Sequence, residues 1–197
     1  FKYGKLYQWG RKYGQGYSLE YDESEPSVLS GPGSLEIGQL EDNSDIYYKG
    51  TSAIGDWLPS PIDGIWNSKS DSEPSKTAND PCPDGWRVPT LKELRSLCEN
   101  KSLWTMNEAS QYGYWFSGTN SYTEDVSRLF LPAAGNRGNN AGQPNYRGEK
   151  GYYWSSEDYY YFSATGNYAH CLIFDSKSSS TGDHSRVYGC SVRCVQE

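Results

Sequence analysis

Aromatic side chains are the feature that most restricts how this sequence can fold. Seven Trp, 18 Tyr and 5 Phe make up 15% of its 197 residues. Each ring removes a large area from water on burial, so the rings supply a core although the mean hydropathy is only −0.84. Disordered chains are depleted in aromatic residues, which argues against that class. We therefore expect a single folded domain over residues 1–197, rich in turns because it contains 21 Gly and 10 Pro.

The charge and hydropathy patterns exclude two classes of partner. The net charge is −7 and the pI is about 4.9, whereas a nucleic-acid-binding protein presents a basic face. The densest basic cluster is Arg11-Lys12, with Lys2 and Lys5 nearby. The sequence therefore predicts no nucleic-acid partner. It also predicts no membrane span, because the best strongly apolar run covers only residues 171–174.

The sequence lacks the common motifs of catalysis and metal binding. It contains no Gly-x-Ser-x-Gly elbow, no His-Glu-x-x-His pair, no Walker loop and no dinucleotide fingerprint. Only two histidines are present, His170 and His184. No cysteine pair has the Cys-x-x-Cys spacing of a zinc site. We therefore expect a non-enzymatic protein with no catalytic residues, no metal and no other cofactor.

One helix and a series of strands are predicted along the chain. Thr90 and Glu93 form the pattern of a capping box, and Leu91 and Leu94 follow at helical spacing. Polar and Gly-rich residues at about 10–45 indicate a loop-rich insertion. Runs typical of strands, separated by turn residues, lie at 3–9, 114–116, 128–131, 152–154, 169–174 and 187–195. A lone helix followed by strands favours the α+β class.

Several blocks of sequence, in a fixed order, carry a resemblance to a known family. The three longest are residues 80–94 (beginning Asp-Pro-Cys-Pro-Asp-Gly-Trp-Arg), 151–156 (Gly-Tyr-Tyr-Trp-Ser-Ser) and 189–195 (Gly-Cys-Ser-Val-Arg-Cys-Val). With shorter blocks at 6–11, 65–67 and 131–137, they resemble the Fibrobacter succinogenes major paralogous domain family. That family occurs on secreted and surface-anchored proteins of Gram-negative bacteria. The resemblance implies a C-type-lectin-like α+β fold, with an antiparallel sheet, one main helix and long loops.

The same resemblance implies a disulfide bond and a compartment. The family pattern pairs Cys82 with Cys194, which would close a loop of more than half the chain and contribute about 4–5 kcal/mol by restricting the unfolded state. An extracytoplasmic location, secreted or at the cell surface, follows because disulfides persist in oxidising compartments. The chain starts at Phe1 without Met, so we expect a processed product or a fragment, with any secretion or lipoprotein signal outside the given sequence.

The remaining cysteines and the arginines of the C-terminal half also lead to expectations. A hairpin turning near Ser180 would place Cys171 opposite Cys190, so a second disulfide is one outcome and two free thiols are the other. Cys98 lies among leucines in the predicted helix, where an inert buried thiol is expected. Burial and pairing with carboxylates are expected for Arg137, Arg147, Arg186 and Arg193.

Carbohydrate binding is the interaction that this aromatic sequence favours, because sugar rings stack on exposed aromatic faces. The candidate ligand-binding residues are Tyr152, Tyr159, Tyr160, Tyr161 and Asn145. Packing in the core or at its rim is the alternative for these rings. In C-type lectins a Glu-Pro-Asn or Gln-Pro-Asp loop holds calcium. Gln143-Pro144-Asn145 has the same form but lacks the carboxylate, so no calcium site is expected.

The resulting functional hypothesis is a recognition module. We expect a non-catalytic, cell-surface or fimbria-associated adhesion domain that binds glycan or protein through loops and an aromatic surface. One alternative is a structural capping or spacer domain of a larger secreted protein. The other is an enzyme of unknown chemistry. An exposed aromatic cluster lining a concavity would favour the first hypothesis, and fully buried aromatics would favour the spacer.

Overall fold

The fold is mainly β-structure arranged in several sheets. A computed structural model describes residues 3–15, 27–29, 46–48, 55–58, 61–68, 72–100, 102–118, 128–139, 142–160 and 167–197. Strands make up 46% of it and helix 6%. The predicted C-type-lectin-like α+β class is therefore wrong. The capping box is a strong local signal, but the helix that it starts has only eight residues, and the remaining elements are strands.

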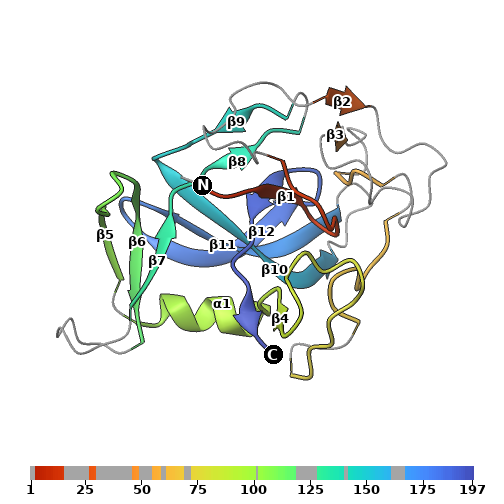
Figure 1. Cartoon of the computed structure of the whole chain (residues 1–197), viewed down its shortest axis with the longest axis horizontal. Coiled ribbons are helices and arrows are strands. Elements are labelled where there is room, and N and C mark those ends of the chain that lie inside the picture. The colour runs from red at the N-terminus through yellow and green to blue at the C-terminus, as the bar shows by residue number, and fades with distance from the viewer. Residues whose placement is uncertain are drawn as a thin grey trace.

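Seven strands form the main sheet, which runs through the centre of the molecule (Figure 1). Their order is β12-β11-β10-β13-β8-β9, and β1 pairs with β13 off this path. All pairs are antiparallel except β10 with β13, which is parallel. The strands are β1 (Leu6–Gln8), β8 (Asn136–Arg137), β9 (Pro144–Asn145), β10 (Lys150–Tyr160), β11 (Asn167–Asp175), β12 (Ser179–Ser185) and β13 (Gly189–Ser191).

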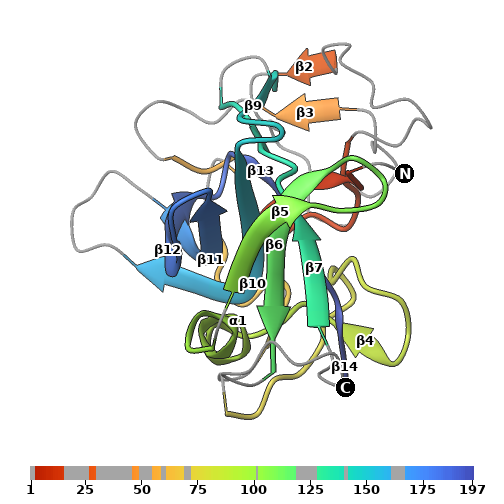
Figure 2. The same ribbon diagram turned by 90° about the vertical axis from the view of Figure 1, so that its left-hand side faces the viewer.

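Three smaller sheets complete the described architecture. Strands β5, β6 and β7 form an antiparallel sheet and lie side by side in Figure 2. Strand β4 pairs with β14 near the C-terminus, and β2 pairs in parallel with β3. Their bounds are β2 (Ser27–Leu29), β3 (Ile46–Tyr48), β4 (Trp86–Arg87), β5 (Ser102–Met106), β6 (Tyr112–Ser117), β7 (Arg128–Pro132) and β14 (Val195–Gln196). Most of the predicted insertion at 10–45 lies outside the described residues.

Helix α1 (Leu91–Cys98) forms where the capping box predicts it. The Thr90 side chain accepts from the Glu93 backbone N–H at 3.2 Å, and Glu93 accepts in return from the Thr90 backbone N–H at 2.8 Å. Leu91 and Leu94 are buried, and the helix packs on β10, β11, β12 and β6 (Figure 1). At eight residues, α1 is too short to cross a membrane, and the described part of the chain contains no other candidate span.

Aromatic rings supply the core, as predicted, and the structure places them on both faces of β10 and β11. Successive residues of a strand point to opposite faces, so Trp154 belongs to one cluster and Tyr153 to the other. In the first cluster, four buried indoles each donate their Nε1–H to a backbone carbonyl, at 2.7–3.3 Å. They belong to Trp9, Trp57, Trp66 and Trp154. The second cluster surrounds Phe174 and contains Leu94 of α1.

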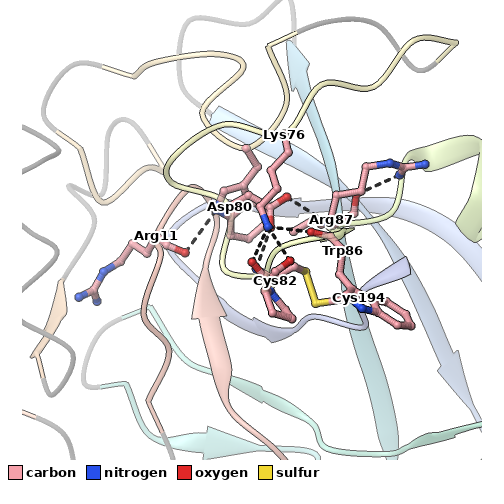
Figure 3. The surroundings of a disulfide bond; sticks show 10 residues. Arg11, Lys76, Asp80, Cys82, Trp86, Arg87 and Cys194 are labelled. Atoms are coloured by element: carbon pink, nitrogen blue, oxygen red, sulfur yellow. Dashed lines mark hydrogen bonds between the residues drawn. A yellow bond between two sulfur atoms is a disulfide. The ribbon is translucent and has the colours of Figure 1, made fainter. Parts of the chain in front are cut away.

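A disulfide bond joins Cys82 to Cys194, with the two Cα atoms 5.9 Å apart, which confirms the predicted pairing. It ties the segment before β4 to the residue before β14. Figure 3 shows Lys76 beside it: the Lys76 Nζ donates to the carbonyl oxygens of Cys82 (2.6 Å), Pro83 (2.7 Å) and Trp86 (2.8 Å). The Lys76 ammonium thus forms hydrogen bonds to three backbone carbonyls in the loop that contains Cys82.

Cys171 and Cys190 form no disulfide and remain free and buried. The hairpin after Cys171 exists, but its second arm is β12, which places Gly182 opposite Cys171. Cys190 lies farther along the chain on β13, and β10 separates β13 from β11. Two strand spacings amount to roughly 9–10 Å, beyond the ~7 Å between Cα atoms that a disulfide tolerates. The outcome with two free thiols is therefore the one observed.

Candidate functional site

A hollow of about 370 Å³ opens between the β5–β6 hairpin and the adjacent ends of β10 and β11. We call it the Trp104 hollow. One wall is aromatic, and the other is formed by residues 148–150 where β10 begins and by Asp175 and Ser176 where β11 ends. The residues that line it are Trp104, Tyr112, Gly148, Glu149, Lys150, Asp175 and Ser176.

The aromatic wall is a pair of nearly parallel rings. Trp104 on β5 and Tyr112 on β6 lie with their ring centroids 6.0 Å apart and their planes at 11°. They are diagonal neighbours across the hairpin, since Trp104 pairs directly with Tyr114. The edges of Tyr114 (5.7 Å) and Phe174 (6.5 Å) hold the indole in place. Tyr112 is 44% exposed and Trp104 is half-buried, so the pair forms a supported aromatic surface that reaches solvent.

The polar wall is built where β10 begins and β11 ends. Lys150 and Asp175 are register partners at this edge. The Asp175 Oδ1 accepts from the backbone N–H groups of Lys177 (2.9 Å) and Ser178 (3.2 Å), and these bonds, with the charge of Lys150, hold the pKa of Asp175 below its usual value. The carboxylate is therefore ionised at neutral pH. Its Oδ2 accepts no hydrogen bond from the described residues and is open to solvent.

A row of aromatic rings outside the hollow begins beside Lys150. The Lys150 Nζ lies 5.1 Å from the centroid of the exposed Tyr146 ring. Beyond it follow Tyr152, His184 and Tyr188, with ring centroids 6.4, 5.2 and 4.2 Å apart in turn. Burial lowers the pKa of His184 to about 4, so this imidazole is neutral at physiological pH.

The structure does not bring the predicted ligand-binding tyrosines together. Tyr152 is only 8% exposed and packs on His184, whose register partner is Ala169. Tyr159 is half-buried and packs on His170, with 4.9 Å between ring centroids. Since Ala169 and His170 point to opposite faces of β11, the two tyrosines lie on opposite faces of the sheet. The side chain of Tyr160 and the whole of Tyr161 lie outside the described residues.

Asn145 lies near Tyr152 and its neighbour His184, and not near Tyr159 on the other face of the sheet. Its register partner on β8 is Asn136, whose amide nitrogen is 3.0 Å from the His184 Nε2. The Asn145 Nδ2 donates within its own turn, to the Gln143 carbonyl at 3.4 Å. Asn145 is thus near the aromatic row but does not line the Trp104 hollow.

Arg186 is buried among carboxylates, as predicted for the arginines. Its guanidinium lies 2.8 Å from Asp63, 3.5 Å from Asp56 and 3.6 Å from Asp158, and it covers the ring of Trp9 at 4.5 Å. Burial raises the pKa of Asp56 to about 6, whereas the hydrogen bond from Arg186 lowers that of Asp63. The cluster fastens residues 55–58 and 61–64 to β10 and serves the fold.

Arg193 differs from that expectation. It is exposed, and it makes no ion pair with any carboxylate among the described residues. Its neighbours Val192 and Cys194 pack on the first core cluster. The side chain between these two neighbours, that of Arg193, instead faces solvent in the segment that joins β13 to β14.

No metal centre is found in the described part of the chain, where no three His, Cys, Asp or Glu side chains are grouped to hold an ion. The fold and the Trp104 hollow together define a β-rich, disulfide-closed domain with an exposed aromatic surface. Residues 93–195 match a family described as a domain of unknown function, DUF8237. Because the match covers more than half of the chain, the protein belongs to that family. Neither a curated protein nor a solved structure matches the chain.

The matched segment contains every residue that lines the Trp104 hollow. Sequence reasoning missed both aromatic residues of the hollow. The signal that could have found them is the alternation of Trp104 and Met106 before a turn, followed by Tyr112 and Tyr114 with the same spacing of two. That pattern is typical of a hairpin with aromatic residues on one face.

Proposed function

We propose that this chain is a non-catalytic recognition module that binds glycan in the Trp104 hollow. The observation that carries the proposal is the exposed, parallel pair Trp104 and Tyr112 beside the Lys150–Asp175 pair. The C–H face of a sugar ring packs on an aromatic surface, and its hydroxyl groups bond to carboxylate and ammonium groups. Charge-assisted hydrogen bonds of this type are about twice as strong as neutral ones.

The size of the hollow favours a small ligand over a protein. A volume of about 370 Å³ is at the low end of the ~300–1,000 Å³ typical of small-molecule sites. A stable protein–protein contact needs ~800 Å² from each partner and a largely apolar centre. A ligand of a few sugar residues fits this volume, and its partly aromatic and partly polar lining, better than a protein partner does.

The charge of the hollow favours a neutral glycan. Glu149 and Asp175 carry two negative charges and Lys150 carries one positive charge, so the lining is acidic overall. Acidic sugars would be repelled by this lining, whereas uncharged hydroxyl groups bond to carboxylates without a charge penalty.

We further propose an extracytoplasmic setting, secreted or at the cell surface, including surface lipoproteins and fimbriae. The Cys82–Cys194 bond supports this, because cytosolic thiols are normally kept reduced. The same bond supports a relationship to the Fibrobacter succinogenes major paralogous domain family, whose pattern implies that pairing.

A glycan array tests the proposed function. The wild type should bind neutral oligosaccharides, and Tyr112→Ala should lose about 10-fold or more in signal, because a ring stack and its buried area are removed. Leu103→Ala is the matched control: Leu103 on β5 is 49% exposed, against 44% for Tyr112, but points to the opposite face from Trp104. Binding by neither protein, or equal loss in both variants, would contradict the proposal and leave the spacer hypothesis ahead.

A further inference from the structure

A second hollow, of about 290 Å³, lies where β1 and β13 meet β7. We call it the Arg193 hollow. Among the described residues, its lining carries two cationic side chains and no carboxylate, in a chain whose net charge is −7. The residues that line it are Tyr3, Gly4, Lys5, Tyr7, Gln111, Phe130, Leu131, Pro132, Tyr153, Ser191, Val192 and Arg193.

Three of these side chains have hydrogen-bonding groups available to a ligand. The exposed Arg193 guanidinium makes no ion pair with a described carboxylate. Gln111 is oriented by Asn107, whose Nδ2 donates to the Gln111 Oε1 at 2.8 Å, so the amide NH₂ is the free end. The Ser191 residue is only 4% exposed; its Oγ lies beside the Tyr153 hydroxyl, but that hydroxyl donates to the Pro132 carbonyl at 2.8 Å, which leaves the Ser191 hydroxyl proton without an acceptor. An unpaired buried hydroxyl costs free energy, and a ligand bound in the hollow would satisfy it.

The chemistry of these groups specifies the ligand. A guanidinium binds a planar carboxylate with two parallel hydrogen bonds, and an amide NH₂ and a hydroxyl add further donors. Tyr3, Tyr7 and Phe130 contribute aromatic surface to the same lining. We propose that the Arg193 hollow binds an acidic sugar residue, with its carboxylate on Arg193 and its ring against the aromatic side chains. This site is distinct from the Trp104 hollow and does not depend on the function proposed for it.

Isothermal titration with D-glucuronate, D-glucose, acetate and inorganic sulfate tests this proposal. Glucuronate should bind, and Arg193→Gln should weaken it about 10-fold or more, because a hydrogen bond to a charged group is lost. Arg193→Lys should give an intermediate loss, since it keeps the charge without the fork, and Ser191→Ala a smaller one. Arg95→Gln, which removes the same charge from an exposed position on α1, should change nothing.

The arms of the experiment separate the outcomes. Binding of acetate or sulfate as tightly as glucuronate would show a general anion site and overturn the proposal. Binding that Arg193→Gln leaves intact would place the ligand elsewhere, and no glucuronate binding would exclude it. Tyr112→Ala should leave glucuronate binding unchanged, so failure here and failure at the Trp104 hollow are distinguishable. Circular dichroism and thermal unfolding of each variant confirm that it is folded.

Discussion

Phe174 lies directly over Gly151, its register partner on β10, so closely that a Cβ on Gly151 would be 2.0 Å from the Cζ of the ring. An aromatic ring covering a glycine on a neighbouring strand is a known way of supporting a sheet. Phe174 also packs against Trp104 in an edge-to-face arrangement, with 6.5 Å between the ring centroids. The absence of a side chain at Gly151 therefore helps to place the aromatic wall of the Trp104 hollow.

Gly151→Ala should destabilise the protein. The added methyl group would displace the Phe174 ring, and overpacking of a core typically costs about 1–3 kcal/mol in the free energy of unfolding. Urea denaturation measures this. Gly118→Ala is the control, because a Cβ there meets no atom within 4 Å, and its effect should be near zero. Equal effects of the two substitutions would contradict the close packing.

Loss of the Cys82–Cys194 bond should lower the free energy of unfolding by about 4–5 kcal/mol, because the loop that it closes is 112 residues long. Urea denaturation of the wild type and of a Cys82→Ser/Cys194→Ser double variant measures the difference. Cys98→Ser serves as the control for losing a thiol outside the bond. A difference below about 1 kcal/mol would show that the bond constrains little of the unfolded chain.

Native alkylation should leave Cys171 and Cys190 unmodified, since burial raises the pKa of both thiols and hides them from reagent. Cys98 is half-buried and its pKa is raised by burial, so it should react slowly. After unfolding without reductant, mass spectrometry should find three modified thiols. A single modified thiol would instead indicate the second disulfide that the structure lacks.

His184 should make stability depend on pH. Its pKa is 6.5 in the unfolded chain and about 4 when folded, so the native state binds fewer protons between these values. The contribution of His184 to the free energy of unfolding is therefore fully present above pH 6.5. It decreases as the pH falls toward 4, by up to about 3 kcal/mol. Asp56, with its raised pKa, acts in the opposite direction over part of this range, so the wild type is compared with His184→Phe. Denaturation at pH 7 and pH 4.5 should show a smaller loss for the variant, and an identical loss in both proteins would refute the assignment.

Local signals in the sequence predicted the elements that depend on nearby residues. The capping box of Thr90 and Glu93 needs only four consecutive positions, and it forms as expected. The strand-like runs at 114–116, 128–131, 152–154 and 169–174 all lie within observed strands. The run at 187–195 was less accurate, because only its middle and its last residue are paired.

The features that the sequence did not predict depend on contacts between residues far apart in the chain. The separation of Cys171 and Cys190 depends on β10 lying between β11 and β13, and a parallel pairing of that kind leaves no turn signal in the sequence. The Trp104 hollow likewise joins a hairpin to the ends of two later strands. The sequence positions of Trp104 and Asp175 give no sign that the two residues lie close together in space. The site could therefore be recognised only in the folded structure.

Chemical shifts of the tryptophan indole N–H groups test the glycan-binding site most directly. The chain has seven Trp, and the indoles of Trp9, Trp57, Trp66 and Trp154 are buried and bonded to backbone carbonyls. Titration of ¹⁵N-labelled protein with neutral gluco-, manno- and galacto-oligosaccharides should shift the Trp104 signal with at least one series and leave those four unchanged. A Trp104 signal that stays fixed at millimolar concentrations of every series would contradict the account.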